Sequence, residues 1–273
     1  METINTADRQ AYRRMTTDEQ RAHFLKSGLF EAGKLNVIYS DVDRAVVAAA
    51  VPTTVKLELT GGKEMACASF HERRESGVIN LGQDGTVTVD GTEYRLATRE
   101  CLYIGKGAKT VVFSSASADE PAQFYLVSYP AHATYPTTQA TLEQANRVEL
   151  GSQKDANQRT IYQFVRPGKI QSCQLVMGFT ELAEGSVWNT YPPHTHDRRT
   201  EVYCYFNLPE NGRVLHLYGE PSETRHLVLQ EKDVVFSPAW SIHSGVGTGS
   251  YRFVWAMGGE NQVFEDMDPA KIR

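Results

Sequence analysis

Short runs of β-branched and aromatic residues, separated by turn residues, dominate the chain after residue 30. Such runs favour β-strands, because side chains of this kind pack well on a pleated surface. Turn signals such as Asp90-Gly91 and Asn211-Gly212 separate consecutive runs. Their close spacing predicts an all-β fold of antiparallel strands, as in a sandwich or barrel. The clearest candidate strands lie at 86–89, 101–104, 111–113, 202–206, 214–218, 226–229 and 253–255.

One short helix is predicted before the strands begin. Thr16 and Glu19 have the spacing of a capping box, in which the two side chains satisfy backbone N–H groups at the start of a helix. Gly28 is placed to end that helix. We therefore expect residues 1–30 to form a helical arm.

Two stretches of the first half recur in the second half. The segment that begins His71-Glu-Arg-Arg matches His196-Asp-Arg-Arg, and Arg99-Glu-Cys-Leu-Tyr matches Lys232-Asp-Val-Val-Phe. The first pair is offset by 125 residues and the second by 133, so the second copy has a longer loop between them. This repeat predicts two homologous β-barrels, at 31–135 and 161–273, joined by a linker at 136–160.

Composition and charge exclude several classes of protein. A chain of 273 residues with 41% hydrophobic content can bury real cores. The net charge is −5, and no Lys/Arg cluster alternates with aromatic residues, so we expect no nucleic-acid partner. No apolar stretch is long enough to span a membrane, and the first thirty residues contain no signal-peptide core.

The four cysteines have no clustered spacing, which points to reduced thiols in a cytoplasmic protein. They are Cys67, Cys101, Cys173 and Cys204.

The densest chemistry lies in the run from His194 to Glu201, with His243 further along the chain. His194 and His196 are two positions apart, so on a strand both imidazoles face the same side. Three imidazoles and a carboxylate suit Zn²⁺, Fe²⁺, Mn²⁺ or Ni²⁺. The alternative is a set of strand residues satisfied by hydrogen bonds, but four ligand-type residues in one pattern favour a single divalent metal site.

The first copy lacks this ligand set. In the register of the repeat it has Ser69, His71, Ser76 and Thr110 where the second copy has the four candidate ligands. We therefore expect the first barrel to bind no metal. His71 lacks partners and His216 lies in the middle of a predicted strand, so a structural role is expected for both.

The pattern His-x-His-x4-Glu, followed by Pro238 and His243, resembles the ligand signature of the cupin superfamily. Longer motifs resemble the 5-keto-4-deoxyuronate isomerase family and are spread over both halves of the chain. They are the segments 103–109, 188–199, 237–247 and 259–264.

This resemblance implies two tandem jelly-roll barrels with one bound zinc per chain. It also implies an aldose-ketose isomerase of pectin and uronate breakdown, which converts 5-dehydro-4-deoxy-D-glucuronate to 3-deoxy-D-glycero-2,5-hexodiulosonate. Members of that family tend to form hexamers, so a homo-oligomer is expected. The alternatives are a metal-dependent cupin dioxygenase and a sugar-binding bicupin without turnover.

An anionic sugar substrate needs a cationic partner and acid/base groups. Arg198, Arg199 or Arg225 is expected to bind the carboxylate, since a guanidinium matches that group with two hydrogen bonds. The alternative is charge in solvated turns. Candidates for the general base are Glu223, Glu260, Tyr203 or a metal-bound hydroxide, and the sequence does not rank them.

Overall fold

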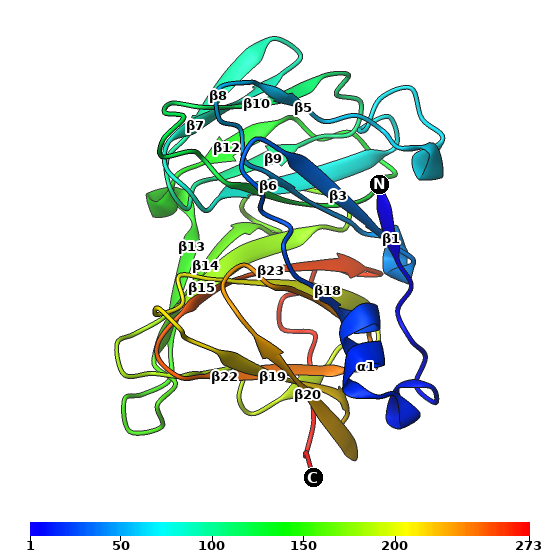
Figure 1. The fold of residues 1–273 in the computed structure, drawn as a ribbon, viewed down its shortest axis with the longest axis vertical. Coiled ribbons are helices and arrows are strands. Elements are labelled where there is room, and N and C mark those ends of the chain that lie inside the picture. Colours follow the sequence, from blue (N-terminus) through cyan, green and yellow to red (C-terminus); the bar gives the residue numbers. More distant parts are fainter. The chain divides into compact units, whose positions relative to one another are not determined.

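A computed structural model describes residues 1–273 and contains one α-helix, α1 (Thr17–Phe24), among 24 strands (Figure 1). The predicted all-β fold is confirmed, and every candidate strand named above forms one. Four short 3-10 helices complete the regular structure: η1 (Tyr12–Arg14), η2 (Val42–Arg44), η3 (Lys63–Met65) and η4 (Leu142–Gln144).

The chain divides into two compact units. The first comprises Met1–Thr3, Gly28–Ala145 and Phe164–Val176, and the second comprises Ile4–Ser27, Asn146–Gln163 and Met177–Arg273. Each unit is built on one seven-stranded and one four-stranded antiparallel sheet.

The first unit follows the strand order β1-β3-β4-β11-β6-β9-β12 in its large sheet and β5-β10-β7-β8 in its small sheet. Along β7, buried Val87 and Val89 alternate with more exposed threonines, so one face of the small sheet closes an apolar core. The strands are β1 (Glu2–Ile4), β3 (Leu35–Ser40), β4 (Val46–Ala50), β5 (Leu57–Glu58), β6 (Arg74–Asn80), β7 (Gly85–Val89), β8 (Thr92–Leu96), β9 (Cys101–Ile104), β10 (Val111–Ser115), β11 (Phe124–Pro130) and β12 (Thr138–Ala140).

The second unit has the orders β13-β14-β15-β23-β18-β21-β2 and β16-β22-β19-β20, with an added two-stranded sheet of β17 and β24. These strands are β2 (Leu25–Lys26), β13 (Asn146–Leu150), β14 (Arg159–Val165), β15 (Val176–Leu182), β16 (Trp188–Asn189), β17 (His194–Thr195), β18 (Arg199–Phe206), β19 (Val214–Glu220), β20 (Glu223–Leu229), β21 (Val234–Ser237), β22 (Ile242–Gly247), β23 (Arg252–Gly259) and β24 (Asp268–Pro269).

The internal repeat is visible in these strands. β6 and β18 begin at Arg74 and Arg199, an offset of 125, and β9 and β21 begin at Cys101 and Val234, an offset of 133. The turns before β9 and β21 also match, because Arg99 and Lys232 both adopt a left-handed conformation with φ of 70° and 63°. The two units therefore share one scaffold.

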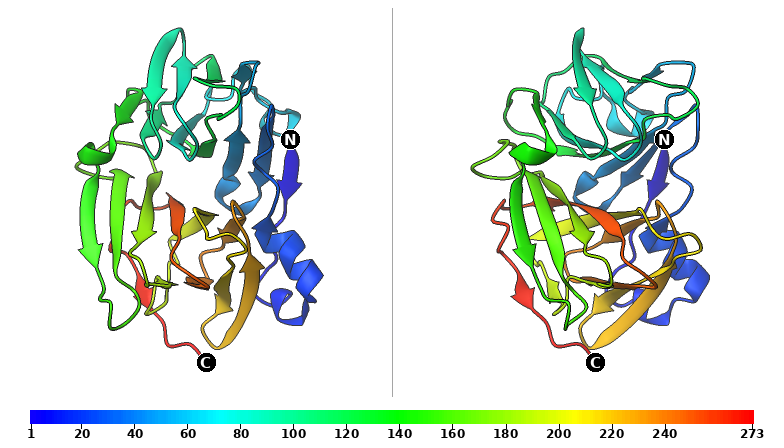
Figure 2. Two further views of the ribbon diagram at one scale, coloured as in Figure 1. Left: turned by 60° about the vertical axis from the view of Figure 1, so that its left-hand side comes forward. Right: turned by 90° about the vertical axis from the view of Figure 1, so that its left-hand side faces the viewer.

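The compact units do not follow the predicted boundaries of 1–30, 31–135, 136–160 and 161–273. Residues 4–27 belong to the second unit, and Figure 2 shows the blue helix α1 beside strands of that unit. There β2 pairs with β21 and Phe24 packs against Tyr218. The predicted linker contains β12, η4 and β13. The polar, turn-rich composition of 136–160 predicted a linker, but its strands pair with the edges of both large sheets: β12 pairs with β9, and β13 pairs with β14.

The N-terminal helix has the predicted capping box between Thr16 and Glu19. It ends at Phe24, before Gly28, because Leu25 is already extended and pairs with Val235.

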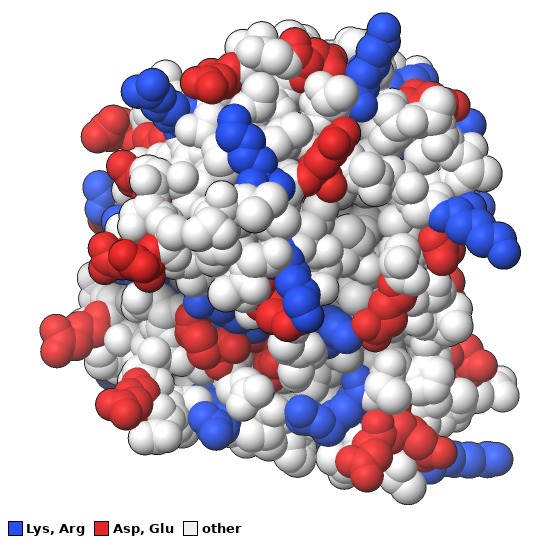
Figure 3. All heavy atoms as spheres, turned by 45° about the horizontal axis from the view of Figure 1, so that its top comes forward, with Lys and Arg blue, Asp and Glu red and all other residues white.

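All four cysteines are free thiols. None of the helices is long and apolar enough to span a membrane. On the face drawn in Figure 3, acidic and basic side chains are interspersed, so that face has no continuous cationic surface for a polyanion.

Glu75 binds the backbone of the segment 173–175, which belongs to the first unit. Its side chain is fully buried and accepts hydrogen bonds from the backbone N–H groups of Cys173, Gln174 and Leu175, at 2.7, 2.9 and 2.9 Å. The hydroxyl of Tyr103 donates a fourth, at 2.7 Å. A carboxylate is suited to this place because it only accepts hydrogen bonds.

We expect Glu75→Gln to lower the free energy of unfolding by about 1–3 kcal/mol, since an amide NH₂ facing N–H donors leaves buried groups unpaired. Urea unfolding followed by tryptophan fluorescence measures the change. Glu93→Gln, at an exposed position of β8, is the control and should shift the midpoint little. Equal midpoints for both variants would contradict this account of Glu75.

Candidate metal centre

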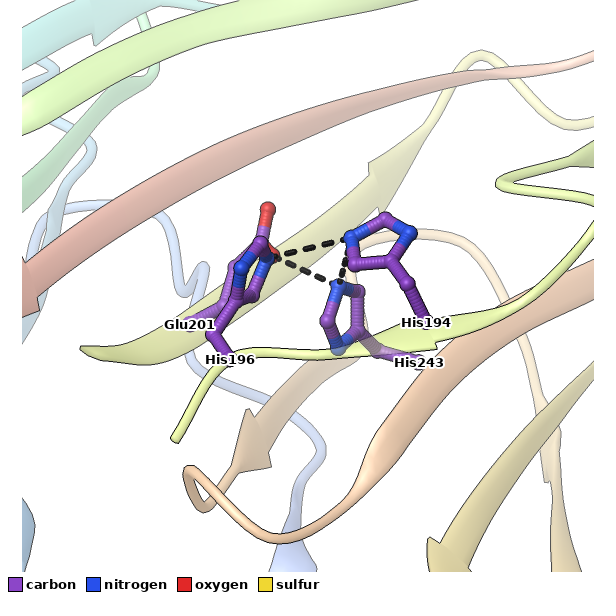
Figure 4. Close-up of side chains that lie close together, drawn as sticks. All are labelled: His194, His196, Glu201 and His243. Atoms are coloured by element: carbon purple, nitrogen blue, oxygen red, sulfur yellow. Dashed lines mark hydrogen bonds and ion pairs between the residues drawn. The ribbon is translucent and has the colours of Figure 1, made fainter. Parts of the chain in front are cut away.

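The four predicted ligands converge inside the second unit (Figure 4). His194 comes from β17, His196 from the turn that follows it, Glu201 from β18 and His243 from β22. Their ligand atoms all lie within 4.8 Å of one another. His196, Glu201 and His243 are buried, and His194 is half-buried.

The separations between these atoms fit one shared ion. His194 Nε2 lies 3.1 Å from the Nε2 atoms of both His196 and His243, while Glu201 Oε2 lies 2.9 Å from His243 Nε2 and 3.3 Å from His196 Nε2. Ligand bonds to zinc of about 2.0–2.2 Å place ligand atoms about 2.8–3.1 Å apart at a right angle and about 3.3–3.6 Å apart at the tetrahedral angle, and the observed separations fall between these limits. Three imidazoles and one carboxylate also leave coordination positions open for a substrate.

The protonation states of His194 and Glu201 favour metal binding. Burial, with the neighbouring His243 and His196, lowers the pKa of His194 to about 2, so its imidazole is neutral and has a free lone pair. Burial opposes ionisation of Glu201, but the charge of His243 and hydrogen bonds from His196 and His243 outweigh it and lower the pKa of that carboxyl. A carboxylate and neutral imidazoles are the forms that bind a divalent ion.

A second layer of contacts orients His196. Its Nδ1–H donates a hydrogen bond to the carbonyl oxygen of Asp266, at 2.8 Å. This bond directs the Nε2 lone pair into the cluster. The same carbonyl accepts a hydrogen bond from Arg199 Nη2 at 2.8 Å, and Arg199 Nη1 donates to the carbonyl of Val263 at 2.6 Å. Arg199 is only 1% exposed, and its two hydrogen bonds hold the segment 263–266 in place.

The cluster opens into a cavity of about 260 Å³. Most of the wall is apolar or aromatic, and Trp255 on this wall donates a hydrogen bond to Thr180 at 3.1 Å. Gly178 makes room for that indole, because a Cβ there would lie 2.6 Å from the ring. The lining residues are Leu150, Arg159, Ile161, Thr180, Thr190, Tyr191, Pro192, His194, His196, Glu201, Tyr203, Phe253, Trp255, Met257, Phe264 and Met267.

The three predicted carboxylate-binding arginines do not line this cavity. Arg198 pairs with Asp266 and Asp268, at 2.6 and 2.8 Å. Arg199 is buried and donates to the backbone of the segment 263–266. Arg225 pairs with Glu223 at 2.7 Å. Arg198 and Arg225 are therefore paired with carboxylates, and the guanidinium of Arg199 is engaged by backbone carbonyls.

Of the three predicted base candidates, only Tyr203 lines the cavity. Its hydroxyl lies 3.0 Å from Thr190 Oγ1, and burial raises its pKa well above the ordinary value. Glu223 lies at the start of β20, paired with Arg225, and Glu260 is exposed just after β23.

The sequence reasoning missed Arg159 and the loop that contributes Phe264 and Met267 to the cavity. Arg159 fell at the end of the predicted linker. Strand alternation was the available signal, since Arg159 and Ile161 are two residues apart on β14 and both face the cavity.

The corresponding place in the first unit contains one histidine. His71 is buried and its Nε2 lies 2.7 Å from Ser76 Oγ, so the counterparts of His196 and Glu201 still touch. Ser69 donates to the carbonyl of Ala108. Across residues 1–273, the cluster in the second unit is the only group of three or more possible metal ligands.

Similar scaffolds occur in solved structures. An IolB-like protein from Salmonella typhimurium LT2 matches with a TM-score of 0.70 and 16% identity, over 88% of this chain and 94% of that one. Lactobacillus farciminis oxalate decarboxylase matches with a TM-score of 0.60 and 11% identity, over 89% and 85%. Two such barrels, one with a cluster of imidazoles and a carboxylate, define a two-domain cupin protein.

The KduI/IolB family matches residues 23–272, and the chain belongs to this family. Two relatives share the name 4-deoxy-L-threo-5-hexosulose-uronate ketol-isomerase. The protein of Lachnoclostridium phytofermentans is 48% identical over 273 residues, which is 100% of this chain and 99% of the relative. The protein of Kineococcus radiotolerans is 52% identical over 261 residues, which is 94% of each.

We expect Arg199→Met to release the segment 263–266, because two charge-assisted hydrogen bonds are lost from a buried place. Hydrogen exchange at the amides of Asp266 and Met267, which are bonded within the loop, should accelerate about tenfold or more. Arg225→Met is the control, and it should leave these two amides unchanged. Unchanged exchange in Arg199→Met would show that other contacts hold the loop.

Proposed function

We propose that this protein is a ketol-isomerase of uronate breakdown. It converts 5-dehydro-4-deoxy-D-glucuronate, an aldehyde, to the ketone 3-deoxy-D-glycero-2,5-hexodiulosonate. The observation that carries the proposal is a metal-type cluster opening into a mostly apolar cavity, in a chain 48% identical over its full length to a relative named as a uronate ketol-isomerase. The cavity volume of about 260 Å³ suits a six-carbon sugar acid.

We propose zinc as the bound ion, held by His194, His196, Glu201 and His243. Such an ion, when bound, supplies a Lewis acid that stabilises negative charge on the oxygens of the reacting carbons. The donor set contains no thiolate, and its mixture of imidazole and carboxylate is typical of catalytic rather than structural zinc.

The reaction moves one proton between adjacent carbons and another between their oxygens, and no electrons leave the substrate. Tyr203 is the predicted acid/base residue that the cavity wall favours. Its raised pKa keeps the hydroxyl protonated, so Tyr203 serves the transfer between oxygens: it donates a proton to one substrate oxygen and receives one from the other, with Thr190 as its hydrogen-bond partner. The proton that leaves carbon is taken by a base other than this protonated hydroxyl.

The metal proposal predicts about one zinc per purified chain and about none in the double variant His194→Ala/His243→Ala, since two of four ligands are gone. Inductively coupled plasma mass spectrometry gives the ratio. His226→Ala removes an exposed imidazole on β20 and serves as the matched control, which should keep the parental content. Two ions per chain, or full occupancy in the double variant, would refute a single site at this cluster.

The enediol route predicts deuterium incorporation when the isomerisation runs in D₂O. The proton removed from carbon exchanges with solvent before it returns, so NMR should find deuterium on the carbon of the new hydroxymethyl group. Full retention of the original hydrogen would instead favour a hydride shift or a fully shielded proton transfer. The same samples separate the other functions, because oxygen uptake would indicate a cupin dioxygenase and binding without turnover a sugar-binding cupin.

A further inference from the structure

A single cationic side chain lines the cavity next to the metal-type cluster. Arg159 is the first residue of β14, and the remaining wall consists of apolar and aromatic residues, two threonines and three residues of the cluster, His194, His196 and Glu201. Arg159 therefore sets the charge of the part of the wall that lies outside the ligand set.

The guanidinium of Arg159 has no acidic partner. Its one hydrogen bond runs from Nη1 to the carbonyl oxygen of Asn157, at 2.9 Å. Arg198 and Arg225, by contrast, form ion pairs with carboxylates. A guanidinium carries five N–H donors, so most of those of Arg159 are available to a ligand.

Arg159 is also partly withdrawn from water. Burial lowers its pKa, while the nearby hydroxyls of Tyr203 and Tyr251 act in the opposite direction. Withdrawing a charge from water without an opposite charge is unfavourable. An anion that enters the cavity would relieve this cost, and it would do so beside Tyr203.

We propose that Arg159 binds the carboxylate of the sugar-acid substrate and so orients the chain of carbons toward the metal cluster. This inference rests on the proposed function, which supplies the anionic substrate. Because Arg159 and the cluster line the same cavity, one substrate molecule can contact both. The planar fork of the guanidinium matches a carboxylate with two hydrogen bonds, and this geometry selects sugar acids over neutral sugars.

The test is a double-mutant-type cycle with D-glucuronate as a probe ligand that carries the same carboxylate as the substrate. One change replaces Arg159 by Gln in the protein. The other replaces the carboxylate of the ligand by a neutral amide, in D-glucuronamide. Affinities come from competition against turnover and from calorimetry on zinc-loaded protein. Arg225→Gln is the matched control, because it removes a partly buried arginine of the same unit that does not line the cavity.

We expect Arg159→Gln to weaken glucuronate binding and to lower kcat/KM for the uronate by roughly 30- to 1,000-fold, with zinc content and unfolding midpoint unchanged. Glucuronamide binding should change little in the same variant. Arg159→Lys should fall between the parent and the Gln variant, because the charge survives but the fork is lost.

Equal losses for glucuronate and glucuronamide would make Arg159 a structural residue and overturn the proposal. Unchanged binding of both would overturn it as well. If Arg159→Gln does not fold, Arg159→Lys replaces it. The affinities of the parent protein for glucuronate and glucuronamide are then also compared, and a ratio near one refutes the proposal. If the parent binds glucuronate through Arg159 but does not isomerise the uronate, the proposed function fails while the carboxylate site stands.

Discussion

Four ligand atoms within 4.8 Å of one another, most of them buried, are the constraint on which the second unit depends. Imidazoles and a carboxylate gathered in this way have lost much of their hydration, so the surrounding structure must hold them in place. The pairing of β18 with β21 and β23 places Glu201, and β22 brings His243 from the opposite sheet. β17 pairs with β24, so the C-terminal segment secures the strand that carries His194.

The same scaffold has two different interiors. In the first unit, Phe70 lies in the apolar core, and the residue 125 positions later is Thr195. Val78 in that core corresponds in the same way to Tyr203 on the cavity wall. The first barrel thus has apolar side chains at these two positions, whereas the second has polar ones, and Tyr203 lines its cavity. The repeat preserves the hydrogen-bonded frame, and the inward-facing side chains decide whether the barrel is a packed core or a site.

Four arginines of the second unit illustrate how environment assigns different roles to one residue type. Arg199 donates to two backbone carbonyls and holds the loop that orients His196, while Arg198 and Arg225 pair with carboxylates. Arg159 faces the cavity without an acidic partner. A cation already neutralised within the protein has little to gain from a substrate anion, so the unpaired arginine is the one suited to recognition.

The sequence by itself predicted the strands, the repeat and the residues of the metal-type cluster, because alternation, turn chemistry and the spacing of His194, His196 and Glu201 are local properties. It did not determine the unit boundaries, since residues 4–27 join the second unit through pairing between β2 and β21. It also could not show that Arg198 is paired, because Asp266 and Asp268 lie about seventy residues from Arg198 in the chain and no local pattern links them. Which charge is neutralised and which is left facing a cavity depends on contacts between distant segments, and only the tertiary structure brings those segments together.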